Sequence, residues 1–573
     1  MQEEKAKDIL SVWVIGLAPF SEKMESTCNN FLSNLQLGLD FIYSREVKDI
    51  SYPPKKTKTV VLCSSQTDIT SISSYEIIPI IFDSNEALHE SSKHINAFLY
   101  DHNDKEKSDE MLCHVILEKF GLIKNTKNVF ISYRREDSLS LAENIRTQLL
   151  MKGYSIFLDK KSIDVGVDFM DSIKLAIANA DVFLLLYSPS YFDSVYTKKE
   201  MYAACIARIP IIILSWEKAE DVNTYGFKHQ KLQNCYSIST IECDDLIENI
   251  NRLQEKTQVF RLQKLRRIYE NFNQEGEISL SSFYVPSMRA KEYSSYHAIF
   301  GIPTTMDLEK IQKKEDNKCI RSSAIYDDLC IPYSYYKHIE WLNNELTHIK
   351  MYRMSTIQGK IDEGQKEDNK TPCVFLSASV PNANDKNYDF LKIHEIVVIL
   401  TSEIIRRGGT LVFGGHPTIT PIIQNIIEIT RVNRQKIGCD DYPDVRLYQS
   451  KYYEGEYPLE VKLFPQNLIR ETAVEEIPND DGEKSKTKNA SLELMRNRMI
   501  HEDGIKYTSA IFLGGKYKDK PEDSGVWREY QMFKEFHQTA CRILIEGTGE
   551  IPKLLKEKEC KDFTRIGDLA ALL

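Results

Sequence analysis

The chain has 573 residues, 42% of them hydrophobic and 28% charged, which excludes a largely disordered chain and predicts three or four folded domains. The net charge of −10, with no domain rich in Lys and Arg, argues against a nucleic-acid partner. There is no apolar run long enough for a membrane helix, no signal-peptide layout, and no CxxC or Cys/His cluster among the twelve cysteines, so we expect a cytoplasmic protein without a membrane partner or a metal site.

Two domains with alternating strands and helices are predicted in the first half of the chain, at residues 1–122 and 123–254. In the first, a small α/β domain, helix-like segments separate short apolar runs at 13–17, 59–63 and 77–82. In the second the alternation is sharper, and buried parallel strands are predicted at 129–131, 155–158, 182–187 and 209–214.

Residues 255–370 lose this alternation, and we expect a helical connector that ends in a flexible polar linker. Alternation returns in residues 371–573, where strands are predicted at 374–377, 410–413, 445–448, 510–513 and 542–545. The predicted fold class is therefore α/β, with several doubly wound, flavodoxin-like or Rossmann-like parallel sheets joined by a helical connector.

Polar residues follow the predicted strands of the second domain. The first strand ends at Ser132, Tyr133 and Arg134, and the second ends at Asp159. Ser188 and Ser190 follow the apolar run at 182–187. Ligands of open α/β sheets bind beyond the carboxyl ends of the strands, so these side chains are expected to face one crevice.

A helix is predicted after the strand at 182–187, with Asp193 or Ser194 as its N-cap. Tyr196 and Glu200 lie four residues apart, which places them on one face near the start of the helix. Small residues that leave room for another element continue along that face: Ala203, Ala204 and Ala207.

The second domain resembles the TIR family through four ordered motifs: VFISYR at 129–134, GYSIFLD at 153–159, SPSYF at 188–192, and the segment from 194 to 200. The resemblance implies that Glu200 is the catalytic carboxylate that cleaves the nicotinamide–ribose bond of NAD⁺. NAD⁺ would then be a substrate, and no cofactor is expected. Such cleavage passes through an oxocarbenium-like state, and the leaving group is already cationic, so one carboxylate can suffice.

The same resemblance implies a substrate site, a mobile flap at 160–168 and head-to-tail self-association into an oligomer or filament. Tyr196 takes the place of an aromatic residue, often Trp, while the small-Cys pair that usually follows it is absent. Tyr196 could instead be a packing residue, and Arg134 a solvated surface charge. The expected substrate-binding residues are Tyr133, Arg134, Asp159, Ser162, Phe169, Ser188 and Tyr196.

Residues 371–573 show a second predicted crevice, because glycine pairs and hydroxyl residues follow several strands. Paired glycines let backbone amides approach a phosphate or ribose, although a single pair is more often a tight turn. No P-loop is present. The expected ligand-binding residues are Ser377, Ser379, Gly414, Gly415, His416, Thr418, Gly514, Gly515, Lys516, Glu529 and Thr548.

This region resembles the SLOG superfamily through VFGGHP at 412–417 and IFLGG at 511–515, with Trp527, Glu529 and Phe533 downstream. The resemblance implies a Rossmann-like domain that senses a nucleotide-derived ligand and is attached to a TIR effector in antiphage defence. His416 and Lys516 are either anion contacts or exposed turn residues. Glu529 either binds a ligand ribose or is a solvated helix residue. The PGGxGTxxE signature of phosphoribohydrolase relatives is missing, so catalysis is not expected here.

Together these features predict an NAD⁺ glycohydrolase of antiphage defence, activated by a nucleotide-derived signal and depleting cellular NAD. The alternatives are a non-catalytic TIR assembly scaffold and a cyclase that makes a cyclic ADP-ribose messenger. The first domain faintly resembles the late strands of a TIR fold but has no glutamate in the catalytic context, so a degenerate TIR-like or a receiver-like module is expected there.

Overall fold

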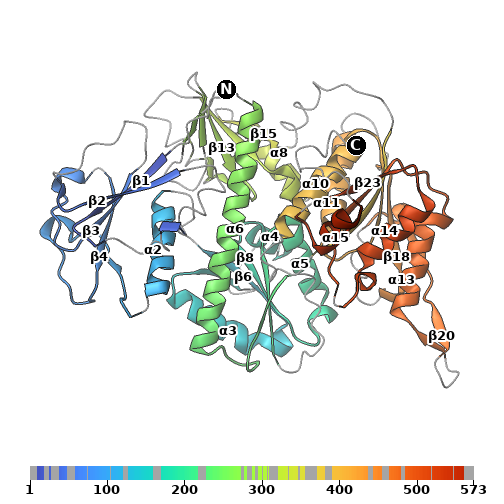
Figure 1. Ribbon diagram of the computed structural model, residues 1–573, viewed down its shortest axis with the longest axis horizontal. Helices are drawn as coiled ribbons and strands as arrows, with labels where there is room; N and C mark the ends of the chain where they lie inside the picture. The colour runs from blue at the N-terminus through green and yellow to red at the C-terminus, as the bar shows by residue number, and fades with distance from the viewer. Residues whose placement is uncertain are drawn as a thin grey trace. The chain divides into compact units, whose positions relative to one another are not determined.

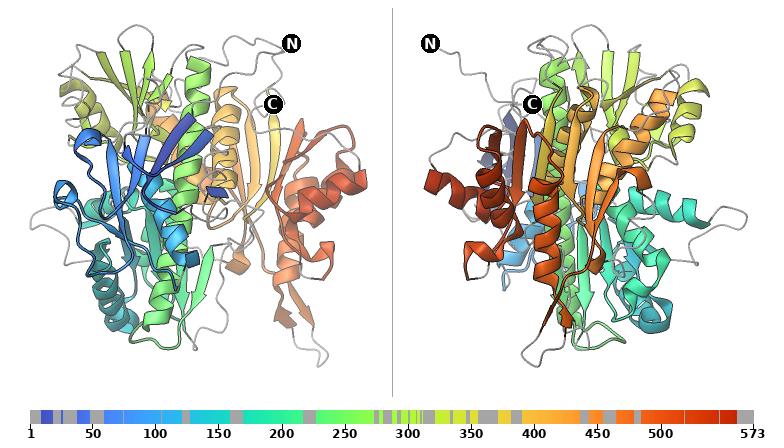
Figure 2. Two further views of the ribbon diagram at one scale, coloured as in Figure 1. Left: turned by 60° about the vertical axis from the view of Figure 1, so that its left-hand side comes forward. Right: turned by 90° about the vertical axis from the view of Figure 1, so that its right-hand side faces the viewer.

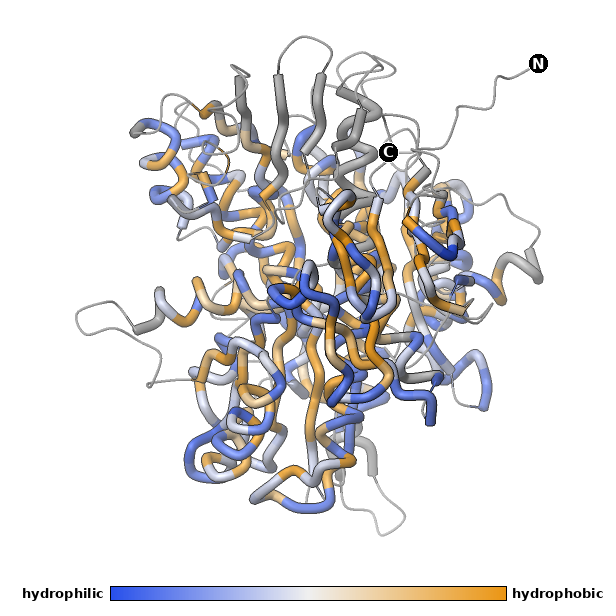
Figure 3. Tube along the Cα trace, turned by 90° about the vertical axis from the view of Figure 1, so that its left-hand side faces the viewer, coloured by the Kyte–Doolittle hydropathy of each residue, from blue (hydrophilic) through white to orange (hydrophobic). Residues whose placement is uncertain are grey.

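The computed structural model contains several parallel sheets, which confirms the predicted α/β class. None of the helices it describes combines the length and the apolar character needed to cross a membrane. Hydrophobic positions gather along the strands, and hydrophilic positions are frequent in the connections between them (Figure 3). The residues described are 9–18, 25–26, 38–47, 59–73, 75–103, 105–120, 127–158, 169–216, 227–272, 277–279, 287–290, 294–299, 301–305, 307–308, 311, 321–332, 335–345, 349–354, 371–380, 390–435, 443–453, 464–478, 484–517, 519–545 and 547–559.

The N-terminal domain is a five-stranded parallel sheet in the order β2-β1-β3-β4-β5 (Figure 1). Alternate residues of its central strands point to opposite faces, so Val12 and Leu62 pack with helix α2 while Trp13 and Cys63 pack with the turn at Ile72. The elements are β1 (Ile9–Ile15), β2 (Gly38–Ser44), β3 (Thr59–Ser64), β4 (Glu76–Ile81), β5 (Phe98–Leu99) and α2 (Lys105–Lys119).

The second domain has the same strand order, because its parallel sheet reads β10-β9-β8-β6-β7. Its central strand β8 is buried throughout, as the unbroken apolar run predicts. The elements are β6 (Asn128–Ser132), α3 (Arg135–Met151), β7 (Ser155–Leu158), α4 (Phe169–Ala178), β8 (Val182–Leu186), α5 (Val195–Ala207), β9 (Ile211–Ser215), β10 (Lys228–Lys231) and α6 (Thr240–Phe272).

The prediction that 255–370 is a helical connector is wrong. Its helical start is the end of α6, which runs across the predicted boundary at 254, and five strands follow in the order β11-β12-β13-β14-β15. Strands β11, β12 and β13 pair antiparallel. They are short and rich in Ser, so they lack the long apolar runs by which the other strands are found. The bounds are β11 (Glu277–Ser279), β12 (Ser287–Ala290), β13 (Ser294–Ile299), β14 (Arg321–Tyr326), α8 (Tyr336–Glu345) and β15 (Lys350–Arg353).

The C-terminal domain is built on a six-stranded parallel sheet in the order β19-β18-β17-β16-β22-β23. Helices α10 and α11 lie on one face, and α13, α14 and α15 on the other (Figure 2). The bounds are β16 (Cys373–Ser379), α10 (Phe390–Arg406), β17 (Thr410–Gly414), α11 (Thr420–Gln435), β18 (Val445–Ser450), β19 (Ile469–Thr472), β20 (Glu476–Pro478), β21 (Lys484–Lys486), α13 (Lys488–Asn497), β22 (Ser509–Gly514), α14 (Gly525–Phe536), β23 (Cys541–Leu544) and α15 (Glu550–Glu559).

Candidate active site

Helix α5 carries Glu200 to the carboxyl end of strand β6. Ser194 is the N-cap, since its side chain accepts a hydrogen bond from the Thr197 amide at 3.5 Å. Glu200 lies on the second turn and is only 6% exposed. Its Oε2 accepts a hydrogen bond of 2.5 Å from the hydroxyl of Ser132, the last residue of β6. A charged carboxylate is therefore held at the edge where ligands of such sheets bind.

Tyr191 completes a buried chain of hydroxyl groups behind this carboxylate. Its Oη lies 2.7 Å from Ser132 Oγ. Burial, followed by the negative charge of Glu200, raises the pKa of Tyr191 well above its usual value, so the phenol keeps its proton. Because Ser132 donates to Glu200, the phenol donates to Ser132 at 2.7 Å, and it also lies within a longer hydrogen-bond distance, 3.4 Å, of the Thr197 carbonyl. The chain Tyr191–Ser132–Glu200 thus fixes the orientation of the carboxylate.

We expect Tyr191→Phe to lower turnover about five-fold at unchanged KM, because it removes one hydrogen bond, worth about 1 kcal/mol, that orients Glu200 without touching substrate. Steady-state kinetics of nicotinamide release would measure this. Tyr236→Phe, which changes an exposed tyrosine of the same domain, is the matched control. An unchanged kcat in Tyr191→Phe would show that the hydroxyl chain does not support the reaction.

A second polar cluster joins the start of α3 to the loop after β8. Asp137 accepts hydrogen bonds from Ser188 Oγ at 2.7 Å and from Ser190 Oγ. The hydroxyl of Ser190 is the largest cause of a lowered pKa of Asp137, which stays ionised. Arg134 donates to the Ser190 carbonyl at 2.7 Å and pairs with Glu136 at 2.6 Å and Asp193 at 3.2 Å. These contacts show Arg134 bound to neighbouring carboxylates.

The other predicted substrate residues lie at different depths. Tyr133 is buried, whereas Tyr196 is 57% exposed although it stands four residues before buried Glu200. Phe169 is the first residue of α4, and nothing is described of its side chain. Asp159 and Ser162 lie outside the described residues, as does the predicted flap. The structure therefore brings Glu200 and the loop that carries Ser188 close to the carboxyl end of β6.

Helix α5 also contacts the C-terminal domain. It packs against α4 and α11, which accounts for the small residues Ala203, Ala204 and Ala207, all buried. The helix ends at Arg208, which has a left-handed conformation with φ 55°. This side chain is 5% exposed and forms ion pairs with Asp327 and with Glu395 of α10. The helix that carries Glu200 is thus tied to the predicted sensor domain.

In the C-terminal domain, Ser377 and Glu529 form a pair like that of Ser132 and Glu200. Ser377 lies in β16, and its hydroxyl donates to Glu529 Oε2 at 2.5 Å. Glu529 belongs to α14, which follows the neighbouring strand β22. Here, however, Arg496 donates to Glu529 Oε1 at 3.2 Å and is itself buried. Glu529 is therefore not a solvated helix residue, and its charge is compensated within the fold.

The glycine pairs of this domain have structural reasons. A Cβ at Gly514, where φ is +70°, would lie 1.6 Å from the Ser379 carbonyl, and one at Gly415 would lie 2.0 Å from the Gln449 amide oxygen. The Gly514 amide donates to Thr548 Oγ1 at 3.1 Å, and the Gly415 amide donates to a backbone carbonyl at 2.9 Å. Both amides thus have acceptors within the domain and do not need a phosphate. Paired glycines predict amides that are open to a phosphate, and these two are not.

The remaining predicted ligand residues differ in their surroundings. Burial lowers the pKa of His416 to about 4, and Nδ1 accepts from the Thr418 amide at 3.3 Å, so the imidazole is neutral at pH 7. It could contact an anion only as a donor through Nε2. Lys516 is exposed, while Gly414, Gly515 and Ser379 lie near the same sheet edge. Their role in ligand binding stays a prediction.

Tyr191 and Asp137 of the two hydroxyl–carboxylate clusters are absent from the predicted site, and Ser132 and Ser190 are expected there only as polar residues at the strand ends. Ser132, Tyr191 and Ser190 stand inside the quoted motifs, and Asp137 follows the first of them by three residues. Their partners, however, are 51 to 68 positions away along the chain, so only the fold brings them together.

Comparison with known proteins identifies two domains in this chain. Residues 129–246 match the model of the TIR domain, and residues 385–570 match that of the SLOG cluster3 family. A stretch of 130 residues is 25% identical to the 2' cyclic ADP-D-ribose synthase BtTIR of Bacteroides thetaiotaomicron; it makes up 22% of this chain and 45% of that protein. The chain thus spans less than half the length of this relative.

Solved structures give only distant similarity. The CMP N-glycosidase BcmB of Clostridium botulinum is 19% identical, with a TM-score of 0.17, over 22% of this chain and 99% of that one. An alpha1,3-fucosyltransferase with GDP is 14% identical, with a TM-score of 0.15, over 45% and 82%. These TM-scores are too low to support an argument. The two family matches, in this order along the chain, show that the protein has the TIR–SLOG architecture.

Proposed function

We propose that the TIR domain cleaves the nicotinamide–ribose bond of NAD⁺ by hydrolysis, with Glu200 as the catalytic carboxylate. The observation that carries this proposal is the buried Glu200, held by Ser132 at the carboxyl end of β6. A carboxylate fixed in a water-poor site stabilises a developing positive charge strongly. Its position at the sheet edge is where a ribosyl group would enter.

The reaction needs little else from the protein. The bond between ribose C1′ and the pyridinium nitrogen breaks, and its electron pair neutralises the departing nicotinamide. The ribosyl cation that forms is stabilised by Glu200. Water adds to C1′ and releases a proton to solvent, which gives ADP-ribose. Because nicotinamide leaves as a neutral molecule, no general acid is required.

Cyclisation is the second candidate, and the similarity to a 2' cyclic ADP-D-ribose synthase favours it. The same cation would then be captured by a hydroxyl group of the substrate instead of water. We expect purified protein incubated with NAD⁺ in ¹⁸O-labelled water to give ADP-ribose that carries the label. A cyclic product, lighter by one water and unlabelled in mass spectra, would establish the cyclase. Absence of both products, with every activator tried, would leave the assembly scaffold.

We propose further that the SLOG domain controls this activity by binding a nucleotide-derived activator made during phage infection, with assembly of TIR domains as the active state. The ion pairs of Arg208 with Glu395 and Asp327 support such control, because they connect α5 directly to helix α10. An activator can act only through a difference in its affinity for the two states of the protein. Movement of α10 on binding would therefore act on the helix that carries Glu200.

A further inference from the structure

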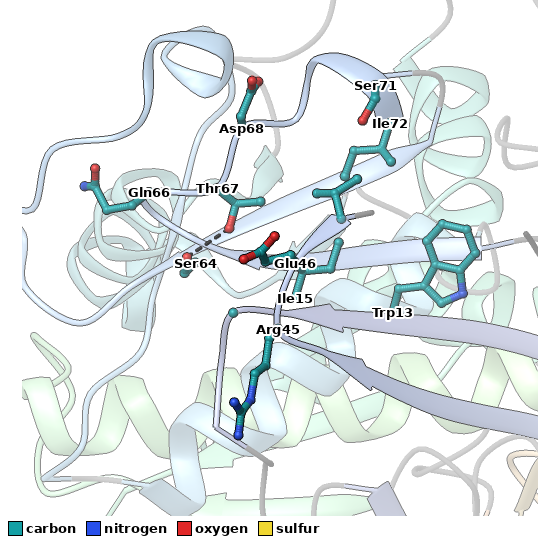
Figure 4. Close-up of a pocket in the computed structure, with 12 residues that line it drawn as sticks. Trp13, Ile15, Arg45, Glu46, Ser64, Gln66, Thr67, Asp68, Ser71 and Ile72 are labelled. Atoms are coloured by element: carbon teal, nitrogen blue, oxygen red, sulfur yellow. Dashed lines mark hydrogen bonds between the residues drawn. The ribbon is translucent and has the colours of Figure 1, made fainter. Parts of the chain in front are cut away.

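The N-terminal domain contains a cavity of about 700 Å³ at the carboxyl ends of its first three strands (Figure 4). The strand order β2-β1-β3-β4-β5 reverses direction between β1 and β3, and a reversal of this kind is where doubly wound sheets bind ligands. The volume is within the range of small-molecule sites. The cavity is lined by Trp13, Ile15, Gly16, Arg45, Glu46, Val47, Ser64, Gln66, Thr67, Asp68, Ser71 and Ile72.

The cavity is lined by the connection that corresponds, in strand order, to the one that holds helix α5 in the TIR domain. In the TIR domain, helix α5 stands between the third strand β8 and the fourth strand β9. In the N-terminal domain, β3 and β4 are joined by residues 65–75. The described residues of this connection contain only the short 3₁₀ turn η2 (Thr70–Ile72). The same strand order without a helix at this position leaves space at the switch point.

The cavity has an apolar end and a polar end. Trp13, Ile15 and Ile72 form the apolar end; Trp13 is 1% exposed and packs on Tyr75 with ring centroids 5.0 Å apart. An apolar wall that contains an aromatic side chain suits a flat heteroaromatic ring.

The polar end provides hydroxyl groups and a carboxylate. Ser64 Oγ and Thr67 Oγ1 lie 2.9 Å apart, and Figure 4 shows Glu46 in the same part of the cavity. Glu46 follows the end of β2, the strand next to β1. Dinucleotide-binding folds place the acidic residue that bonds ribose hydroxyls after the second strand in the same way.

The cavity has few groups that could bind a phosphate. Gly16, with φ +66°, makes the turn after β1, but the next residues are Leu17 and Ala18, so the glycine-rich loop that admits a pyrophosphate is missing. The described lining residues carry two carboxylates, Glu46 and Asp68, against one guanidinium. This balance disfavours a highly charged anion.

We propose that this cavity binds a nucleoside, with the base against the apolar end and the ribose hydroxyls at Glu46, Ser64 and Thr67. The N-terminal domain then has a ligand site of its own, separate from the TIR and SLOG sites. The proposal does not depend on NAD⁺ cleavage, so it stands or falls by binding alone.

Isothermal titration of the full chain with adenosine, guanosine, cytidine and uridine tests the proposal. We expect saturable binding of at least one nucleoside below about 1 mM, weakened ten-fold or more by Glu46→Gln, because hydrogen bonds to a charged carboxylate are the strong ones. Ser71→Phe, which fills the cavity, should abolish binding. Ser73→Phe in the same turn, which lies outside the lining, and Glu90→Gln on the exposed surface should leave it unchanged.

Three results would overturn the proposal. The first is that none of the four nucleosides binds. The second is binding that persists in the Ser71→Phe and Glu46→Gln variants, which would place the ligand in another domain. The third is AMP binding ten-fold or more tightly than adenosine, since the site would then select a phosphate. Far-UV circular dichroism of each variant shows whether a lost signal reflects lost binding or lost structure.

Discussion

Replacing Glu200 by Gln is expected to lower NAD⁺ cleavage by roughly 10²- to 10³-fold, the loss typical of removing one charge-stabilising group from an active site. The amide has the size of the carboxylate and can still accept the hydrogen bond from Ser132, so the side chain keeps its place. The substitution removes the negative charge that is proposed to stabilise the ribosyl cation. Nicotinamide release by the purified chain measures the effect.

Glu248→Gln is the matched control for this experiment. Glu248 lies on α6, has an exposed side chain and pairs only at the surface with Arg252, so its neutralisation should leave turnover unchanged. In cells, NAD measured before and during phage infection should fall with wild type and Glu248→Gln and stay level with Glu200→Gln. Wild-type nicotinamide release by Glu200→Gln would make Glu200 a structural residue and restore the scaffold hypothesis.

Arg208→Met is expected to destabilise the TIR and SLOG domains by about 3–5 kcal/mol, because it removes the positive charge that neutralises two buried carboxylates. Burial alone would lower the pKa of Arg208, but Asp327 and Glu395 outweigh it and raise the pKa, so the guanidinium is charged at every accessible pH. The midpoint of urea unfolding, followed by tryptophan fluorescence, measures the change.

Two further variants test whether the loss of stability is specific to the buried ion pairs of Arg208. Arg252→Met removes an exposed i,i+4 pair and should change stability by less than about 0.5 kcal/mol. Adding Asp327→Asn and Glu395→Gln to Arg208→Met removes the uncompensated charges and should restore much of the midpoint. If Arg208→Met unfolds at the wild-type midpoint, the buried ion pairs do not hold the domains together.

The fold of the TIR and SLOG domains could be predicted because their strands are unbroken apolar runs. Val182–Leu186 is buried at every position, and such a run has few alternatives to a central parallel strand. The position of Glu200 near the start of a helix could be predicted because Ser194 caps that helix, whereas its catalytic role comes from the TIR resemblance and stays a prediction.

The other features of the candidate sites depend on contacts between residues that lie far apart in the sequence, which local spacing cannot predict. Ser132 and Glu200 are 68 positions apart, and the two partners of Arg208 are 119 and 187 positions away. Helical spacing alone placed Tyr196 beside Glu200, yet the packing of α5 buries one and exposes the other. The connector was misassigned because strands such as Ser287–Ala290 have no apolar run to reveal them.

Ser377 and Glu529 of the SLOG domain repeat the serine–glutamate pair of the TIR domain, but in the SLOG domain the glutamate is bound by Arg496. In the TIR domain the substrate itself would bring the positive charge to the glutamate, and only for the lifetime of the reaction. In the SLOG domain Arg496 supplies that charge permanently. A ligand proposed to bind there would meet a glutamate that already has a cationic partner, Arg496, which also pairs with Glu493 at 3.6 Å. Under the proposed function, the same serine–glutamate pair would serve bond cleavage where the substrate brings the counter-ion, and ligand binding where the fold supplies it.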